Sequence, residues 1–190
     1  MTARRYQSGV TLLELLIALS IISILTTITL SSWSRLVEQS RHQSIITAYQ
    51  SGFAYARWVA ASERAIVTVC PLSSSGKCTD NWNQRVSIFI DNNNDKKPDD
   101  RAILTTIQKP SERYVVTSRT GGRGYIQFNH LGMIHGAAGG IVVCPATDRP
   151  ESKISYMALN KGGRFRSVHE LSSVGKIKLK WGATITCPPI

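Results

Sequence analysis

The sequence predicts an α+β protein in which one long N-terminal helix packs on an antiparallel β-sheet. Three observations indicate this fold class. After Trp33 no glycine occurs until Gly52 and no proline until Pro71, so nothing interrupts a helix there. Beyond that point, short β-branched and aromatic runs are separated by turn-forming residues. All four cysteines also lie in this second part, which is typical of a domain that folds in an oxidising compartment.

The helix begins with a long apolar segment. No charged residue occurs between Leu15 and Ser34, and twenty helical residues extend for roughly 30 Å, the thickness of the bilayer hydrocarbon. Arg4 and Arg5 precede it, which predicts a cytoplasmic N-terminus and a following domain in the periplasm. A cleaved secretory signal would end in small residues in an Ala-x-Ala-like pattern, and none follows the apolar segment. We therefore expect residues 10–34 to remain as a transmembrane half-helix.

Glu14 places a carboxylate near the start of this apolar segment. A charge inside a membrane helix costs about 2.5–3.5 kcal/mol on insertion scales, so a compensating partner is expected. Cleavage after Gly9 would create an amine on Val10, about one helical turn from Glu14. The two charges would pair within one chain or between neighbouring chains, which would align the helices. An ordinary signal anchor with its Glu near the headgroups is the alternative.

Residues 35–62 continue the helix as an amphipathic half. Five residues on this half recur at spacings of three and four and define one apolar face: Ile45, Tyr49, Gly52, Ala56 and Val59. Core packing against the sheet is the natural role of such a face.

Residues 63–190 form the predicted β-rich periplasmic domain. Its expected antiparallel strands are Ala65–Cys70, Val86–Asp91, Ile103–Ile107, Tyr114–Ser118, Tyr125–Phe128, Ile141–Cys144 and Lys153–Leu159.

The four cysteines allow three pairings. We favour Cys70 with Cys78, which closes a short Pro-Leu-Ser-Ser-Ser-Gly-Lys loop, and Cys144 with Cys187, which ties the C-terminal tail to a strand. A zinc site is the competing interpretation. However, the sequence contains no Cys-x-x-Cys pair, and its four histidines are not spaced as zinc ligands are.

The segment from Asp91 to Asp100 carries oxygen ligands at several positions of a calcium-binding loop. However, Lys96 occupies the position of the turn glycine and Ala102 that of the bidentate glutamate. A solvated hairpin loop is the preferred interpretation. The chain also has no phosphate-binding Gly-rich loop, no nucleophile elbow and no His-Glu-x-x-His motif. The sequence therefore predicts no catalytic residue, no bound metal and no cofactor, and a protein that is not an enzyme.

The formal net charge is +11, and loss of Arg4 and Arg5 with a leader of residues 1–9 leaves 21 basic against 12 acidic side chains, or +9. The region after Lys161 is the most basic. In it, Lys176, Lys178 and Lys180 alternate with apolar residues, so a strand would present three lysines on one face. Such lysines often only protect a sheet edge from aggregation, which is the alternative interpretation.

The run Lys161-Gly162-Gly163-Arg164-Phe165-Arg166 is more specific. On an extended backbone Arg164 and Arg166 point the same way, while Phe165 faces inward as an anchor. Two guanidinium groups side by side suit phosphates, and binding of this kind is independent of base sequence and weakens with salt. Arg119 and Arg123, around the Thr120-Gly121-Gly122 turn, would extend this patch if the fold brings them close.

The run Gly9-Val10-Thr11-Leu12-Leu13-Glu14 closely resembles the leader junction of type IV prepilins and type II secretion pseudopilins. Several later segments follow one another in an order that resembles that of the FimT and GspH branch of minor pilins. These segments are Cys70-Pro71 with Cys78 and Trp82, Ile88 to Asp91, Ile126 to Gly132, Val142 to Cys144, and Gly163 to Arg166. The resemblance implies that Gly9 ends the leader, that Val10 is the N-methylated first residue, and that Glu14 recruits the subunit into a filament. It also implies a DNA-binding role for Arg164 and Arg166.

Together these features predict a minor type IV pilin in or near the pilus tip that supports pilus biogenesis and binds DNA during natural transformation. The expected partners are other major and minor pilins, the prepilin peptidase, the inner membrane and double-stranded DNA. Two alternatives remain. One is a GspH-like pseudopilin of type II secretion, and the other is a structural tip adaptor whose basic tail meets an acidic subunit without binding DNA.

Overall fold

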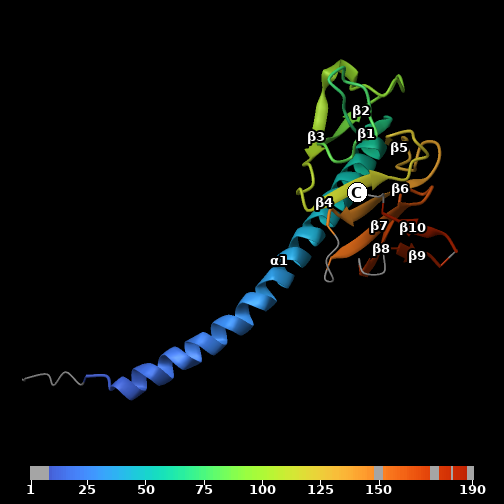
Figure 1. Cartoon of the computed structure of the whole chain (residues 1–190). Helices are drawn as coiled ribbons and strands as arrows, with labels where there is room; N and C mark the ends of the chain where they lie inside the picture. The colour runs from blue at the N-terminus through green and yellow to red at the C-terminus, as the bar shows by residue number, and fades with distance from the viewer. Residues whose placement is uncertain (1–8, 148–151, 172–175, 181, 188–190) are drawn as a thin grey trace, which may run out of the picture. The chain divides into compact units, whose positions relative to one another are not determined.

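The computed structural model describes residues 9–147, 152–171, 176–180 and 182–187, and for residues 28–32, 101 and 171 it describes the backbone alone. The chain divides into two compact units, one up to Glu38 and one from Gln39 onward. Figure 1 shows the long helix and the strands that follow it. The α+β fold that the sequence predicts is confirmed.

Helix α1 (Leu12–Ser62) begins with a side-chain cap. The Glu14 backbone N–H donates to Thr11 Oγ1 at 3.2 Å, and the Leu15 N–H donates to the Thr11 carbonyl at 3.1 Å. Thr11 therefore satisfies donors that the first helical turn leaves open. The cap also places Glu14 in the first turn, where the helix dipole favours a negative charge.

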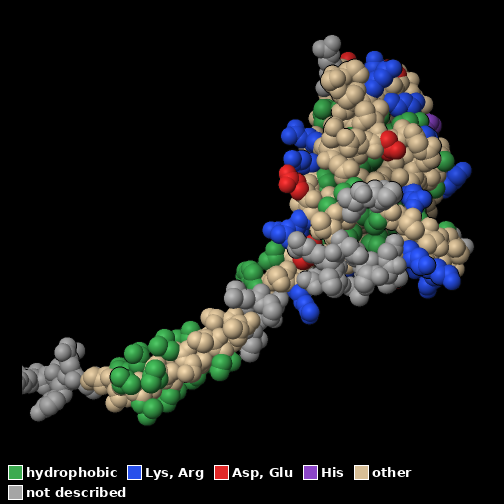
Figure 2. Space-filling model, viewed as in Figure 1, with side chains coloured by type: hydrophobic (Ala, Val, Ile, Leu, Met, Phe, Trp, Pro, Cys, Tyr) green, Lys and Arg blue, Asp and Glu red, His purple; other side chains and the backbone are tan. Residues whose placement is uncertain are grey.

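The N-terminal unit exposes a large apolar surface, which Figure 2 shows in green. Leu12, Leu16 and Leu25 are among many aliphatic side chains that are more than half exposed. The hydroxyls of Ser20 and Ser23 donate to the carbonyls one turn earlier, so the helix itself satisfies these polar groups. An apolar surface of this size marks a site of association.

Within the part of the chain that the structure describes, no helix is long and apolar enough to cross a membrane. The predicted segment 10–34 includes residues 28–32, whose side chains lie outside the described set. Membrane crossing by this segment stays a prediction.

The described residues of the domain from Gln39 form two four-stranded antiparallel sheets and a two-stranded one, where the sequence suggested a single sheet. The first sheet has the order β3-β2-β1-β5, from β1 (Val67–Pro71), β2 (Val86–Ile90), β3 (Ile103–Ile107) and β5 (Ile126–Phe128). The second has the order β4-β6-β7-β8, from β4 (Tyr114–Ser118), β6 (Gly139–Pro145), β7 (Lys153–Leu159) and β8 (Phe165–Leu171). Strands β9 (Lys176–Lys178) and β10 (Thr184–Thr186) pair as a hairpin, and the short 3₁₀ helix η1 (Asp99–Arg101) precedes β3.

One face of α1 packs against both four-stranded sheets and forms the main core. Ile46, Tyr49, Phe53, Ala56 and Val59 are each at most 4% exposed and recur every three or four residues. The predicted face of the helix is therefore the one that packs in the core. Ile46 and Phe53 are also buried in it, whereas Ile45 is only partly buried at its margin. Gly52 allows the closest approach to the sheet, because a Cβ there would lie 2.5 Å from the Ile107 side chain. Burial raises the pKa of Tyr49, whose hydroxyl donates to the Trp82 carbonyl.

A second, smaller core lies on the opposite face of the β4-β6-β7-β8 sheet, where the β9–β10 hairpin packs. It contains Val142, Cys144, Ile154, Ile177, Leu179 and Ile185. The Cys144–Cys187 disulfide, with Cα atoms 5.8 Å apart, links the hairpin segment to the central strand β6. The Cys70–Cys78 disulfide closes the short loop after β1, so both pairings favoured from the sequence form.

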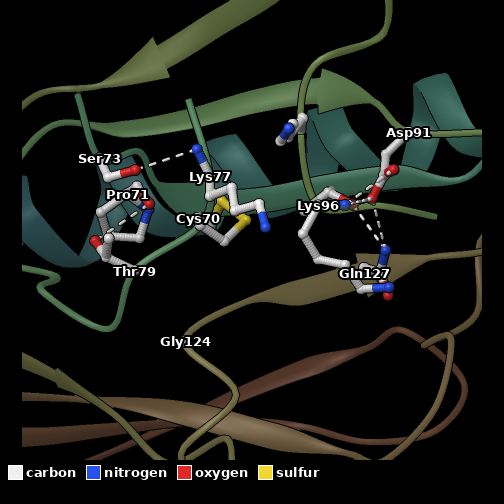
Figure 3. Close-up of a disulfide and its surroundings, with 12 residues drawn as sticks. Cys70, Pro71, Ser73, Lys77, Thr79, Asp91, Lys96, Gly124 and Gln127 are labelled. Atoms are coloured by element: carbon white, nitrogen blue, oxygen red, sulfur yellow. Dashed lines mark hydrogen bonds between the residues drawn. A yellow bond between two sulfur atoms is a disulfide. The ribbon is translucent and has the colours of Figure 1, made fainter. Parts of the chain in front are cut away.

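The loop that follows β2 is anchored by a buried carboxyl group. Asp91 is fully buried and accepts from the Thr68 hydroxyl at 2.7 Å, the Asp95 backbone N–H at 2.9 Å and the Gln127 amide at 3.0 Å. Figure 3 shows Asp91 and Gln127 meeting beside Lys96, near the Cys70–Cys78 disulfide. The interpretation of this segment as a solvated hairpin loop is confirmed for residues 92–100, which are exposed or partly exposed between the antiparallel strands β2 and β3. Asp91 differs, because its carboxyl oxygens turn inward and hold the loop.

Among the described residues, no group of three or more His, Cys, Asp or Glu side chains is arranged to hold a metal ion. The Asp91 oxygens instead accept from the protein's own amides and hydroxyl.

Replacement of Asp91 by Ala should lower the free energy of unfolding by about 3 kcal/mol, because it leaves the buried Thr68 hydroxyl without its acceptor and removes one of the three acceptors of the Gln127 amide. Urea denaturation, followed by the fluorescence of the buried Trp82, would measure the change. Glu112→Ala removes an exposed carboxyl and is the control, with an expected change within about 0.5 kcal/mol. Equal stability of the two variants would show that Asp91 is not an anchor.

Candidate functional site

The start of α1 presents the residues that the sequence singled out for assembly. Val10 is 72% exposed and lies directly before the capping Thr11. The Glu14 side chain is exposed in the first helical turn. Gly9 is also exposed, and a Cβ at this position would meet nothing within 4 Å. The carboxylate is therefore accessible to a partner group, either from its own chain start or from another subunit.

The second candidate region begins at the turn between β7 and β8, which Asn160 organises. The Asn160 N–H donates to the Arg164 carbonyl, and the Asn160 side-chain oxygen accepts from the Arg164 N–H, both at 3.0 Å. The Lys161 carbonyl accepts from the Ile134 N–H at 3.0 Å, which fastens the turn to the segment after β5. Lys161 and Arg164 are both exposed on this fixed turn.

Gly163 is buried where this turn meets the rest of the domain. It has a φ of +71°, and a Cβ at this position would lie only 2.3 Å from the Gly132 carbonyl oxygen. Carbon and nitrogen atoms of the Arg57 side chain would lie at 3.4 Å. Arg57, on α1, therefore stands directly beside the turn that carries Arg164. Sequence analysis missed Arg57, because its helical position gives no sign that it approaches a turn so far along the chain.

The alternation expected for Arg164, Phe165 and Arg166 is present. Both arginines are exposed, while Phe165 is half-buried and packs against the main core. Ser167, two residues further, accepts from the Gln50 amide of α1 at 2.8 Å, so this side of β8 faces the helix. Arg166 therefore points to the opposite face of the sheet, which we call the outer face.

The β9–β10 hairpin covers part of this outer face and carries its lysines on the side turned away from the sheet. Lys176, Lys178 and Lys180 are exposed, whereas Ile177 and Leu179 are buried in the second core. The predicted alternation is therefore present in β9 and just after it, although Trp181 lies outside the described residues. Figure 2 shows Lys and Arg side chains gathered near β9 and β10.

The turn after β4 contributes one arginine to this face. Arg119 is exposed, and its backbone N–H donates to the Gly140 carbonyl of β6 at 2.7 Å. Arg123 is different, because its guanidinium donates to the carbonyls of Thr120 at 2.7 Å and Ala137 at 3.1 Å. Arg123 thus holds its own turn together and is not an extension of the basic surface.

A polar cluster lies between α1 and the second sheet. Ser155 Oγ lies 2.8 Å from His42 Nε2 and 2.5 Å from His169 Nδ1. Partial burial, and then the positive charge of Lys153, lower the pKa of His169. Ser155 is fully buried, so this arrangement joins β7 to the helix and offers no nucleophile to a substrate.

A long helix packed on antiparallel sheets, with a leader-like start and a disulfide-bonded domain, defines the class of pilin-like proteins. A family model described as type II transport protein GspH matches residues 46–163, and the prokaryotic N-terminal methylation motif matches residues 4–30. The chain belongs to the GspH family, and it is a minor pilin or pseudopilin of a type IV pilus or a type II secretion system. Members of this class are structural subunits that assemble with other pilins.

Two solved structures illustrate the likeness. The type IV minor pilin FimU of Pseudomonas aeruginosa matches with a TM-score of 0.52 at 17% identity, over 74% of this chain and 92% of that one. The minor pseudopilin EpsH of Vibrio cholerae matches with a TM-score of 0.47 at 11% identity, over 65% of this chain and 94% of that one. The FimU likeness shows a shared fold. No curated protein sequence matches the chain.

Gly163→Ala should destabilise the protein by about 2 kcal/mol or more, because the positive φ is strained for alanine and the new Cβ would clash with the Gly132 carbonyl. Gly162→Ala is a matched control in the same turn. Its Cβ would meet only the Asn160 side-chain oxygen, at 3.5 Å, so a change within about 0.5 kcal/mol is expected. Thermal unfolding of both variants would measure the difference. A tolerated Gly163→Ala would mean that the turn is not fixed against Gly132.

Proposed function

We propose that this protein is a minor pilin that enters a type IV pilus at or near the tip, and that the outer face of its second sheet binds DNA. The observation that carries the DNA role is that the exposed Arg166 of β8 lies on the same side of the second sheet as the disulfide-bonded hairpin, whose three lysines are exposed. We also propose that the protein is not an enzyme, and that other pilins, not small substrates, are its main partners.

Assembly would begin in the inner membrane, with residues 10–34 as the anchor and the folded domain in the periplasm. A prepilin peptidase would cleave after Gly9 and methylate the amine of Val10. The N-terminal methylation motif over residues 4–30 supports this processing. Glu14 would then pair with the new amine of a neighbouring subunit, and its exposure in the first turn of a capped helix supports this role.

Glu14→Gln should leave the protein at normal levels in the inner membrane but remove it from sheared filaments, because the amide cannot neutralise an incoming amine. Immunoblots of membrane and filament fractions from the same cells would measure the distribution. Glu63→Gln, which changes an exposed carboxylate just after the helix, is the control and should assemble normally. Normal recovery of Glu14→Gln in filaments would refute the role of the carboxylate.

DNA would bind through its phosphates. Arg164 and Arg166 can each present a planar pair of donors to a phosphate, and Lys161 adds a point charge on the same turn. Lys176, Lys178 and Lys180 would extend the contact along the hairpin. Each phosphate contact releases condensed counterions, so the affinity should fall steeply with salt and depend little on base sequence.

Replacing both Arg164 and Arg166 by Ala should weaken DNA binding and lower the slope of log affinity against log salt by about 2, since two phosphate contacts are lost. Fluorescence polarisation with labelled DNA across a salt series would measure both quantities. The control replaces Arg85 and Lys109 by Ala, because both are exposed and lie outside the second sheet. This control removes the same charge and should keep the original slope. An equal loss in both double variants would point to a non-specific effect of net charge.

The principal alternative is a pseudopilin of type II secretion, and the description of the matching family model favours it. In that role the same anchor and Glu14 would serve a periplasmic pseudopilus, and the basic face would meet an acidic partner subunit. Binding to acidic pseudopilins without any affinity for DNA would support this alternative over the proposed one.

A further inference from the structure

Four residues form a row directly across the β4-β6-β7-β8 sheet near the β7–β8 turn. Gly140 on β6 pairs with Ala158 on β7, and Ala158 pairs with Arg166 on β8. Arg119, one residue beyond β4, lies opposite Gly140 and donates its N–H to the Gly140 carbonyl. Since neighbouring strands are about 4.8 Å apart, three spacings separate the two arginine backbones by about 14 Å.

The strand alternation places this whole row on the outer face. On β4 and β6, Val116, Ile141 and Val143 belong to the main core, so the residues between them face outward. The same alternation sends Arg119 and Gly140 outward. On β7, Met157 and Leu159 belong to the main core, so Ala158 and its partner Arg166 also face outward.

The Tyr156 ring lies over this row. A Cβ at Gly140 would lie 2.6 Å from Cε2 and 2.9 Å from Cζ of Tyr156, so the ring occupies the space that the glycine leaves. Burial raises the pKa of Tyr156, and the positive charge of Arg119 opposes part of that rise. Tyr156 is half-buried, while Arg119 and Arg166 are exposed at the two ends of the row.

The described residues of the hairpin leave this end of the outer face accessible, since Tyr156 and Ala158 are half-buried there. The second core covers Val142, Cys144 and Ile154, and Tyr156 packs at its margin. Beyond Tyr156, towards the turn, the row contains only the small residues Gly140 and Ala158 between the two arginines. A partly exposed aromatic ring between two cations is a surface on which a nucleic-acid base can stack while its flanking phosphates are held.

We propose that Tyr156 is a stacking platform for an unpaired base, with Arg119 and Arg166 holding phosphates on either side, so that this row selects single-stranded DNA. The inference rests on the proposed DNA-binding function and names the form of DNA that this part of the surface takes. In a duplex the bases are stacked on each other and their faces are closed, so a ring lying on a sheet cannot reach them. The lysines of the hairpin contact phosphates in either form and do not distinguish the two.

The test uses the full chain in a nonionic detergent and a fluorescein-labelled oligothymidine, compared with a duplex of equal length. Tyr156→Leu keeps an apolar side chain on Gly140 but removes the aromatic face, and it should lower the affinity for the single strand about tenfold. The affinity for the duplex should change less than about twofold. Tyr156→Phe keeps the ring and should bind both forms like the parent chain. Arg119→Ala should also weaken single-strand binding, whereas Arg85→Ala, the exposed arginine control, should not.

A second measurement does not depend on the stability of a variant. The parent chain is irradiated with an oligonucleotide that carries 5-iodouracil, and the crosslinked peptide is identified by mass spectrometry. A crosslink at Tyr156 supports the inference, and crosslinks confined to other segments overturn it. Equal losses for both DNA forms in Tyr156→Leu also overturn it, while leaving DNA binding by Arg164 and Arg166 intact. A parent chain that binds neither form would overturn the proposed function itself, together with this inference.

Discussion

The side chains of α1 between Ile46 and Ala60 pack against two separate sheets, so the relative position of those sheets depends on one helical face. The fit includes a close approach at Gly52, where no larger residue would leave room for Ile107. Polar contacts add to it, because Gln50 and His42 reach Ser167 and Ser155 of the second sheet. As this packing uses the inner face of the second sheet, the outer face remains available for the hairpin and for exposed cations.

The outer face of the second sheet has two parts, one covered by the hairpin and one carrying exposed side chains. Near Cys144 it is covered by the β9–β10 hairpin, whose apolar residues complete a second core. Near the β7–β8 turn it carries small residues, one ring and exposed arginines. Both regions result from the alternation of side chains along each strand. When one residue of a strand points toward the helix, the next residue points to the outer face. A single sheet thereby joins a packed core to a charged surface without any additional domain.

Sequence reasoning located the helix and the first seven strands, because each has a local signal such as periodicity or flanking turn residues. Both favoured disulfides also form, although only Cys70 and Cys78 are close in the sequence. It placed the strands in one sheet where there are two, because an alternating pattern defines a strand but not its neighbour. The burial of Asp91 was missed for a similar reason, since its acceptor role depends on Gln127 from a distant strand. Arg57 and Tyr156 were also missed, because their positions depend on turn packing and on cross-strand register. Arg164 and Arg166 were selected from a short contiguous run of the sequence, and their role in DNA binding stays a prediction.

The Cys144–Cys187 bridge spans a sequence separation of 43 residues, and strands β7, β8, β9 and β10 all lie inside the loop that it closes. A tensile load applied anywhere in that loop reaches β6 by two covalent routes, through the backbone and through the bridge. The edge strand β8 and the hairpin cannot be peeled away from the C-terminal end, because that end is bonded to an interior strand. For a subunit of a filament, this arrangement gives the C-terminal part of the domain mechanical resistance.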